Sequence, residues 1–305
     1  MTRRPLKDVA ASVHQRLLNR AREIGRPFNE LLQYYAMERF LYRLSRTRHA
    51  GKFILKGALV FRAWHASLSR PTKDIDFLGR LRNDLRVVAA AVGDACRQEV
   101  EPDGMTFDAE SVEAISIVEE GDSAGVRVRL RGALANARVS LQVDVGFGDV
   151  VTPAAKAVMY PTILDFPSPR LRGYSRESAI AEKFHTMVKL RSLNSRMKDF
   201  YDVWVLLRRF DFDGRVLATA IRRTFANRQA EVPSRVVAFD ESFANDPTKT
   251  TQWTAFARRS RLGDAPQSFG DVVASVAAFL APVAVALSQG QPFRKVWHAG
   301  GSWVT

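Results

Sequence analysis

Two aspartates separated by one apolar residue, Asp74 and Asp76, are the residues in this sequence best placed to do chemistry. Because side chains alternate across a strand, both carboxylates project from one face while Ile75 and Phe77 enter the other. Two carboxylates this close repel each other unless a cation lies between them or one takes up a proton. Mg²⁺ is bound in proteins by one or two carboxylates together with substrate phosphates. The pair therefore predicts a site for a divalent cation and a phosphorylated substrate, and a solvated strand end is the alternative interpretation.

A third acid, Asp144, stands inside an apolar segment that is predicted to be a strand over 139–147. Valine and leucine occupy every second position there, and Asp144 lies on the opposite face with Ser140 and Gln142. An acid within an apolar strand is costly unless it is paired or bound to a ligand. Asp144 is therefore expected to be paired or to bind a ligand, or else to be an acid on the solvated face of a sheet.

The segment from Leu55 to Leu78 must position the aspartate pair. The sequence predicts a strand over 53–55, a break at Gly57 and a helix over 58–64 before the strand that carries both aspartates. A glycine between strand and helix is typical of a loop that approaches phosphates closely, because backbone N–H groups at a helix start bind anions.

Helical periodicity dominates both ends of the chain. The aromatic residues of the second helix could stack on bases, but their spacing is more typical of core packing. These aromatic residues are Tyr34, Tyr35, Phe40 and Tyr42. Helices are predicted over 7–24, 28–44, 83–98, 176–193 (with Ser175 as N-cap), 250–259 and through most of 216–287.

Further strands are predicted over 114–118 and 126–134. The second carries three arginines on one face, which could contact phosphates or line a solvated surface, and the sequence does not choose between these. They are Arg127, Arg129 and Arg131. The proline-rich stretch 150–170 predicts a linker with one edge strand at 160–163. The last residues, 291–305, are expected to be frayed, and Trp297 and Trp303 have no assigned role there.

The composition is that of a globular protein with an unusual charge. The 305 residues include 46 Lys and Arg against 32 Asp and Glu, which leaves a net charge of +14. Such an excess predicts attraction to polyanions such as nucleic acid, although an arginine-rich soluble protein would have the same balance. The single cysteine, Cys96, excludes an intrachain disulfide framework. No signal peptide and no stretch as long as a membrane span is found, so a cytoplasmic protein without membrane contact is expected.

Two segments resemble a known protein family. Lys56-Gly57 followed by Arg70-x-Thr72-x-Asp74-x-Asp76 is similar to the nucleotidyltransferase fold of DNA polymerase β relatives, and most closely to the AbiEii family. Members of that family are nucleotidyltransferase toxins of bacterial type IV toxin–antitoxin and phage-defence systems. The second segment, from Glu182 to Trp204, reads EKFHTMVKLRSLNSRMKDFYDVW. With the N-terminal helices, the resemblance covers nearly the whole chain.

The resemblance implies an α+β fold. A polymerase β-like mixed sheet with flanking helices is expected over 1–165, including the helical N-terminus, and a C-terminal helical domain over 166–305.

The resemblance also implies a set of site residues. Asp74, Asp76 and Asp144 would hold Mg²⁺ or Mn²⁺, with a nucleoside triphosphate (NTP) as co-substrate. Lys183 would lie at the triphosphate and Asp202 would belong to the catalytic set. Asp199 would support them, and the expected nucleotide-binding residues are Lys56, Gly57, Ala58, Arg70, Thr72, Lys183 and Arg196.

One departure from the family pattern lies at Ala58. The family usually has a second small residue of the Gly-Gly or Gly-Ser type after the first glycine. Alanine offers no hydroxyl to a phosphate, which leaves the identity of the nucleotide and the tightness of its binding in doubt.

The resemblance and the charge together imply transfer of a nucleoside monophosphate to RNA. The expected acceptor is the 3′ end of tRNA, whose extension would block translation, and the expected neutralising partner is a cognate antitoxin that need not touch the protein. One alternative is a nucleotidyltransferase that modifies a protein or a small molecule, for which +14 is a poor match. The other is a catalytically decayed nucleotide-binding or nucleic-acid-binding module, against which the three acids and Lys183 argue.

Overall fold

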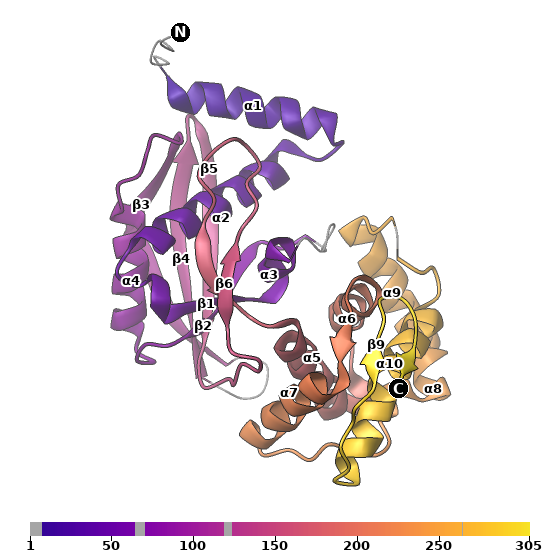
Figure 1. Cartoon of the computed structure of the whole chain (residues 1–305). Coiled ribbons are helices and arrows are strands. Elements are labelled where there is room, and N and C mark those ends of the chain that lie inside the picture. Colours follow the sequence, from indigo (N-terminus) through magenta and orange to yellow (C-terminus); the bar gives the residue numbers. More distant parts are fainter. Residues whose placement is uncertain (1–7, 65–70, 119–123, 264) are drawn as a thin grey trace. The chain divides into compact units, whose positions relative to one another are not determined.

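The computed structural model describes residues 8–64, 71–118, 124–263 and 265–305 (Figure 1). The contacts divide the described chain into two compact units. We call the first the sheet unit; it contains residues 8–64, 72–148 and 157–173. We call the second the helical unit; it contains residue 71, residues 149–156 and residues 174–305. Each unit is built from separate pieces of sequence, so the chain passes between them more than once.

The described residues of the sheet unit form a mixed sheet of seven strands, in the order β3-β4-β5-β2-β1-β7-β6. The first three strands form an antiparallel meander, while β2 pairs parallel with β5 and antiparallel with β1. β7 pairs parallel with the other edge of β1. The strands are β1 Phe53–Lys56, β2 Asp74–Gly79, β3 Met105–Val118, β4 Ala124–Leu134, β5 Ala137–Gly146, β6 Lys156–Met159 and β7 Arg170–Gly173.

Among the residues that the structure describes, four α-helices belong to the sheet unit. α2 packs against β5, β7 and α4, and its three tyrosines and Phe40 are buried in the core, where they cannot stack on a nucleic acid. Tyr35, for example, is fully buried and its hydroxyl donates to the carbonyl of Asp103 at 2.7 Å. Asp8 and Asp84 cap α1 and α4 by accepting hydrogen bonds from first-turn N–H groups. The helices are α1 Val9–Glu23, α2 Phe28–Arg46, α3 Gly57–Ala63 and α4 Leu85–Arg97, with a 3₁₀ turn η1 Ala50–Lys52 before β1.

α5 of the helical unit is capped by Ser175, whose hydroxyl accepts from the N–H of Ser178 at 3.1 Å, as the sequence predicts. α5 packs on α7, and α10 packs on α6, α7, α8 and α9. The α-helices are α5 Arg176–Leu190, α6 Met197–Arg209, α7 Gly214–Asn227, α8 Glu241–Ala244, α9 Pro247–Ser260 and α10 Phe269–Ser288. The smaller elements are η2 Arg191–Leu193, η3 Val237–Phe239, β8 Phe212–Asp213, β9 Val296–Trp297 and β10 Trp303–Val304.

Two sequence expectations about irregular segments are wrong. The stretch 160–163 forms no strand, because the edge strands of the sheet lie on either side of it, in β6 and β7. The C-terminal residues are ordered: β9 pairs with β8 and with β10. The indole N–H of Trp297 donates to the carbonyl of Leu207 at 2.7 Å, and that of Trp303 donates to the carbonyl of Phe279 at 2.8 Å. Two indoles that each find a carbonyl partner hold this tail against the helices.

The expectation that no stretch is long enough to span a membrane is also wrong. Among the described residues, α10 has the length and composition to do so, with 20 residues and a mean hydropathy of 2.0. Core helices of soluble proteins meet the same criterion. One side of α10, including Val276, Phe279 and Leu280, is fully buried in this structure.

Candidate active site

The two aspartates of β2 and the aspartate of β5 share one face of the sheet. β2 and β5 are parallel neighbours in which Asp76 is the register partner of Asp144 and Asp74 that of Gln142. Register partners on adjacent strands project to the same side, so all three carboxylates lie on one patch. Asp74 and Asp76 are half-buried, and Asp144 is only 7% exposed. The structure thus brings together the three acids that the sequence singles out.

Gly57 lies against one of these carboxylates. It has a φ of +65°, and a Cβ built at this position would overlap Oδ2 of Asp76. Both facts favour glycine, because only glycine adopts this backbone conformation freely and leaves the space that the carboxylate occupies. The preceding residue, Lys56, is the register partner of Asp76 across β1 and β2. The turn between β1 and α3 is therefore built around the Asp76 side chain.

Arg127 of β4 binds the third acid with two hydrogen bonds. Its Nε and Nη2 each donate to Asp144 over 2.8 Å, and Nε2 of Gln142 donates to the same carboxylate at 3.2 Å. The hydrogen bonds to Asp144 raise the pKa of Arg127, and the charges of Asp144, Asp74 and Asp76 raise it further. One guanidinium therefore interacts with all three acids.

The starts of the two acid-bearing strands are tied to α2. Nε2 of Gln33 donates to the carbonyl of Lys73 at 3.3 Å and to that of Ser140 at 3.1 Å. The N–H of Thr72 donates to the hydroxyl of Tyr34 at 3.1 Å, and Oγ1 of Thr72 accepts from the N–H of Asp74 at 3.4 Å. Thr72 thus has a positioning role at the start of β2. Arg70, expected at the nucleotide, lies outside the described residues.

The carboxylate oxygens of the three aspartates are the type of ligand that a hard divalent cation prefers. Mg²⁺ and Mn²⁺ prefer carboxylate oxygens, and Asp74 and Asp76 supply them from one strand face. In the described part of the chain, no group of three or more acidic, histidine or cysteine side chains is closed into a metal-binding arrangement.

A second cluster of predicted site residues lies within the helical unit. Nζ of Lys183 is 2.9 Å from Oδ1 of Asp199 and 2.8 Å from Oδ2 of Asp202, and Nε of Arg196 is 2.6 Å from the other oxygen of Asp199. Both acids are almost fully buried. Burial alone would raise the pKa of Asp199, but the charges of Lys183 and Arg196 outweigh it and hold this pKa well below its usual value. The predicted helical face of Arg196, Asp199 and Asp202 is therefore an ion network with Lys183 at its centre.

The histidine in the same sequence segment has a structural role. His185 is buried with its ring against Phe225, and Nδ1 lies 3.2 Å from Nη1 of Arg228. Burial, with the nearby charge of Arg228, lowers the pKa of His185 to about 4. It is therefore neutral at pH 7.

Sequence reasoning missed the side chains that hold the acids. Gln33 and Gln142 gave no signal of their own, because a glutamine on a helix or strand face is common. Arg127 was visible as one of three arginines on a strand face, yet its partner depends on the register of β4 against β5, in which Arg127 is opposite Asp144. That register cannot be read from either strand alone.

Carboxylates on two adjacent strands, beside a glycine turn that leads into a helix, form the kind of site that metal-assisted phosphoryl transfer requires. The chain belongs to the AbiEii family: the family model described as "Nucleotidyl transferase AbiEii toxin, Type IV TA system" matches residues 39–275. It is therefore a nucleotidyltransferase of a toxin–antitoxin family, and membership implies an NTP substrate and a cognate antitoxin. The fold class expected from the sequence is confirmed by the mixed sheet followed by helices.

Solved structures and curated proteins add little to this assignment. A Helicobacter pylori protein described as a candidate nucleotidyltransferase is 14% identical with a TM-score of 0.45, and the match covers 85% of this chain and 95% of that one. JHP933 from Helicobacter pylori is also 14% identical with a TM-score of 0.45, over 86% of this chain and 92% of that one. No curated protein matches the chain.

Proposed function

We propose that this protein transfers a nucleoside monophosphate from an NTP to an RNA acceptor, the 3′ end of tRNA, and thereby blocks translation. The observation that carries the proposal is the register of β2 and β5, in which Asp76 lies beside Asp144 and Asp74 lies on the same face. The net charge of +14 favours a polyanionic acceptor over a protein or a small molecule. The reaction belongs to the metal-dependent nucleotidyltransferases of EC class 2.7.7.

In this proposal Asp74, Asp76 and Asp144 hold Mg²⁺ or Mn²⁺. A divalent cation bound there supplies a Lewis acid for the phosphate oxygens and the acceptor hydroxyl. The half-buried pair on β2 gives two ligands directly. Asp144 would be a further ligand if Arg127 released one of its two hydrogen bonds. Arg127 thus holds the third carboxylate in a fixed orientation.

The remaining proposed roles concern the phosphates. The main chain at Lys56, Gly57 and Ala58 lies beside Asp76, so a phosphate held by the site would meet these N–H groups rather than side chains. Lys183 and Arg196 are proposed to neutralise charge on the triphosphate, and Asp202 is proposed to hold the Lys183 ammonium in place. This ammonium is fixed by two buried carboxylates, which sets its orientation in advance.

The cellular role follows from the proposed chemistry. An enzyme that extends tRNA acts in the cytoplasm, and its cognate antitoxin limits it during normal growth. We propose that it serves in phage defence.

The test is incubation with total tRNA and each of the four α-labelled NTPs, with Mg²⁺, with Mn²⁺ or with excess EDTA. Labelled tRNA is expected with one or more NTPs in either metal and none in EDTA. Asp74→Asn, Asp76→Asn and Asp144→Asn should each lower transfer by more than about a hundredfold, since an amide cannot replace the carboxylate charge. If the label enters protein or a small molecule, the acceptor is that molecule and not RNA. If no combination of NTP and metal gives transfer, the result favours a catalytically decayed binding module.

A further inference from the structure

The helical unit has a basic groove between the start of α6 and the second half of α9. Its volume is about 520 Å³. Four cationic side chains line it, and no Asp or Glu is among its described lining residues. The four are Arg196, Lys198, Arg258 and Arg259. A concave surface lined only by positive charges focuses the electrostatic potential and attracts anions.

Two of these cations have no side-chain partner in the part of the chain that the structure describes. Arg258 and Arg259 are exposed, and neither forms an ion pair or a hydrogen bond with the described residues. Arg196, by contrast, is held by Asp199 at 2.6 Å. The groove therefore has one side fixed by the Lys183 network and another whose arginines are available to a ligand.

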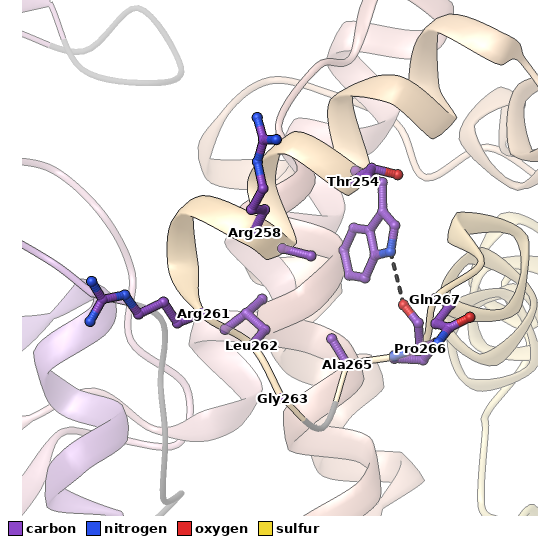
Figure 2. Close-up of a pocket in the computed structure, with 10 residues that line it drawn as sticks. Thr254, Arg258, Arg261, Leu262, Gly263, Ala265, Pro266 and Gln267 are labelled. Atoms are coloured by element: carbon purple, nitrogen blue, oxygen red, sulfur yellow. Dashed lines mark hydrogen bonds between the residues drawn. The ribbon is translucent and has the colours of Figure 1, made fainter. Parts of the chain in front are cut away.

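The positive charge continues around α9. The hollow in Figure 2 lies on the neighbouring side of this helix, has a volume of about 760 Å³ and shares Arg258 with the groove. Two residues that line this hollow are hydrogen-bonded to each other: the indole N–H of Trp253 donates to the carbonyl of Pro266 at 2.9 Å. Figure 2 shows the guanidinium groups of Arg258 and Arg261 directed away from that indole. Basic residues at a helix C-terminus also compensate the helix dipole. This is the alternative, purely structural explanation of the arginines at the end of α9.

The groove wall also contains an aromatic ring and an unsatisfied acceptor. Phe256 is half-buried, supported from behind by Tyr201 and Trp253 with ring centroids 5.9 and 5.7 Å away. Oε1 of Gln252 is buried and accepts no hydrogen bond from the described residues. A buried acceptor without a donor is costly, and a ligand that carries N–H or O–H groups would satisfy it. Nucleobases and ribose carry such groups.

We propose that this groove binds the single-stranded end of the RNA acceptor, with phosphates on Arg258, Arg259 and Lys198 and a base on Phe256. Single-stranded nucleic acid is recognised by a basic track interleaved with aromatic rings, which is the combination present here. The β4 arginines are a poorer candidate, because Arg127 binds Asp144 and Arg131 lies 3.5 Å from Asp108. The inference rests on the proposed function only in naming RNA as the acceptor.

The test measures RNA binding without catalysis. Fluorescence anisotropy of a fluorescein-labelled single-stranded 12-mer RNA is recorded with the full chain, in EDTA and without NTP, between 50 and 200 mM salt. Each phosphate contact to a single strand contributes about 0.7 to the log–log salt slope. Arg258→Gln/Arg259→Gln should therefore lose about tenfold in affinity and make the slope shallower by about 1.4.

The matched control is Arg222→Gln/Arg294→Gln, which removes the same charge from two exposed arginines of the helical unit outside the groove. It should lose less than about threefold in affinity, with a slope change of less than about 0.5. Equal losses in the two double variants would overturn the proposal. Thermal unfolding of each variant checks that the fold is unchanged.

A third variant separates stacking from charge. Phe256→Leu keeps an apolar side chain against Tyr201 but removes the ring, so affinity should fall about fivefold while the salt slope stays the same. If Phe256→Leu binds RNA normally and poly-glutamate displaces the RNA at equal charge concentration, the groove is a general anion surface and the proposal fails.

These results are independent of the transferase assay. If the protein binds RNA through the groove but transfers no label, the RNA-binding proposal is supported and the proposed transferase activity is rejected. If the protein transfers label to tRNA normally but the groove substitutions leave its RNA affinity unchanged, only the RNA-binding proposal for the groove is overturned.

Discussion

The guanidinium of Arg127 donates two hydrogen bonds of 2.8 Å to the carboxylate of Asp144. The antiparallel register of β4 and β5 places these residues opposite each other, with Asp76 on the next strand. The third acid of the candidate site is thus neutralised by the protein itself. A cation that approaches Asp74 and Asp76 meets the fixed positive charge of Arg127 as well as three carboxylates.

Removing that charge should have opposite effects on stability and on metal binding. Arg127→Gln leaves an acid whose side chain is 10% exposed without its main partner, and we expect a loss of about 1–3 kcal/mol in the free energy of unfolding. The affinity for Mn²⁺ should rise, because the competing cation is gone. Calorimetric titration and thermal unfolding with and without Mn²⁺ measure both effects. Arg129→Gln, on the same strand face, is the control, and equal metal affinity in wild type and Arg127→Gln would refute the competition.

Gly57→Ala should disturb the site more than the fold. The new Cβ would overlap the Asp76 carboxylate, and the φ of +65° is unfavourable for alanine. We expect a loss of about 1–3 kcal/mol in stability and a loss of transfer similar to that of Asp76→Asn. Gly51→Ala is the matched control, because a Cβ there meets no atom within 4 Å. A Gly57→Ala enzyme with full activity would show that Asp76 can move freely.

Replacing Lys183 should destabilise the helical unit and abolish the use of NTP at any salt concentration. Lys183→Met leaves Asp199 and Asp202 buried with one cation fewer, which should cost about 3 kcal/mol of stability. In the wild type the pKa of Asp199 is lowered on folding, so its stabilising effect is present above the unfolded value of 3.8 and is lost as the pH falls below it. Denaturant unfolding between pH 3 and 7 should show this loss in the wild type and a smaller one in Lys183→Met. Lys189→Met, an exposed position on the same helix, is the control. If Lys183→Met changed only the salt dependence of RNA binding, this residue would belong to the RNA surface.

Glu38 should make the sheet unit less stable as the pH rises. Glu38 and Arg39 are both fully buried and form an ion pair of 2.9 Å, yet burial outweighs the charge of Arg39 and raises the pKa of Glu38 to about 7. A carboxyl whose folded pKa lies above its unfolded value of 4.5 stabilises fully below pH 4.5, and this contribution disappears as the pH rises through about 7. Glu38→Gln can still accept the hydrogen bond from the N–H of Ile163. It should flatten the stability profile between pH 4.5 and 7 by about 2–3 kcal/mol, as measured by urea unfolding. Parallel profiles for the two proteins would contradict the raised pKa.

The sequence predicted local features well where short-range rules decide them. The alternation that places Asp74 and Asp76 on one face, the break at Gly57 and the cap at Ser175 all depend on neighbouring residues, and the structure has each of them. The Arg127–Asp144 pair and the Gln33 bridge depend on which strands become neighbours, which local patterns do not contain. The C-terminal tail was missed for the same reason, because Trp297 and Trp303 find their carbonyl partners in α6 and α10.

The place of β7 in the sheet has a consequence for synthesis on the ribosome. All three acids are present once β5 has emerged, but β1 lies between β2 and β7, and β7 ends only at Gly173. Until then the outer edge of β1 has no strand partner, and an unpaired edge recruits other strands. A nascent chain therefore carries all three acids before β7 can pair with β1 and complete the sheet beside them.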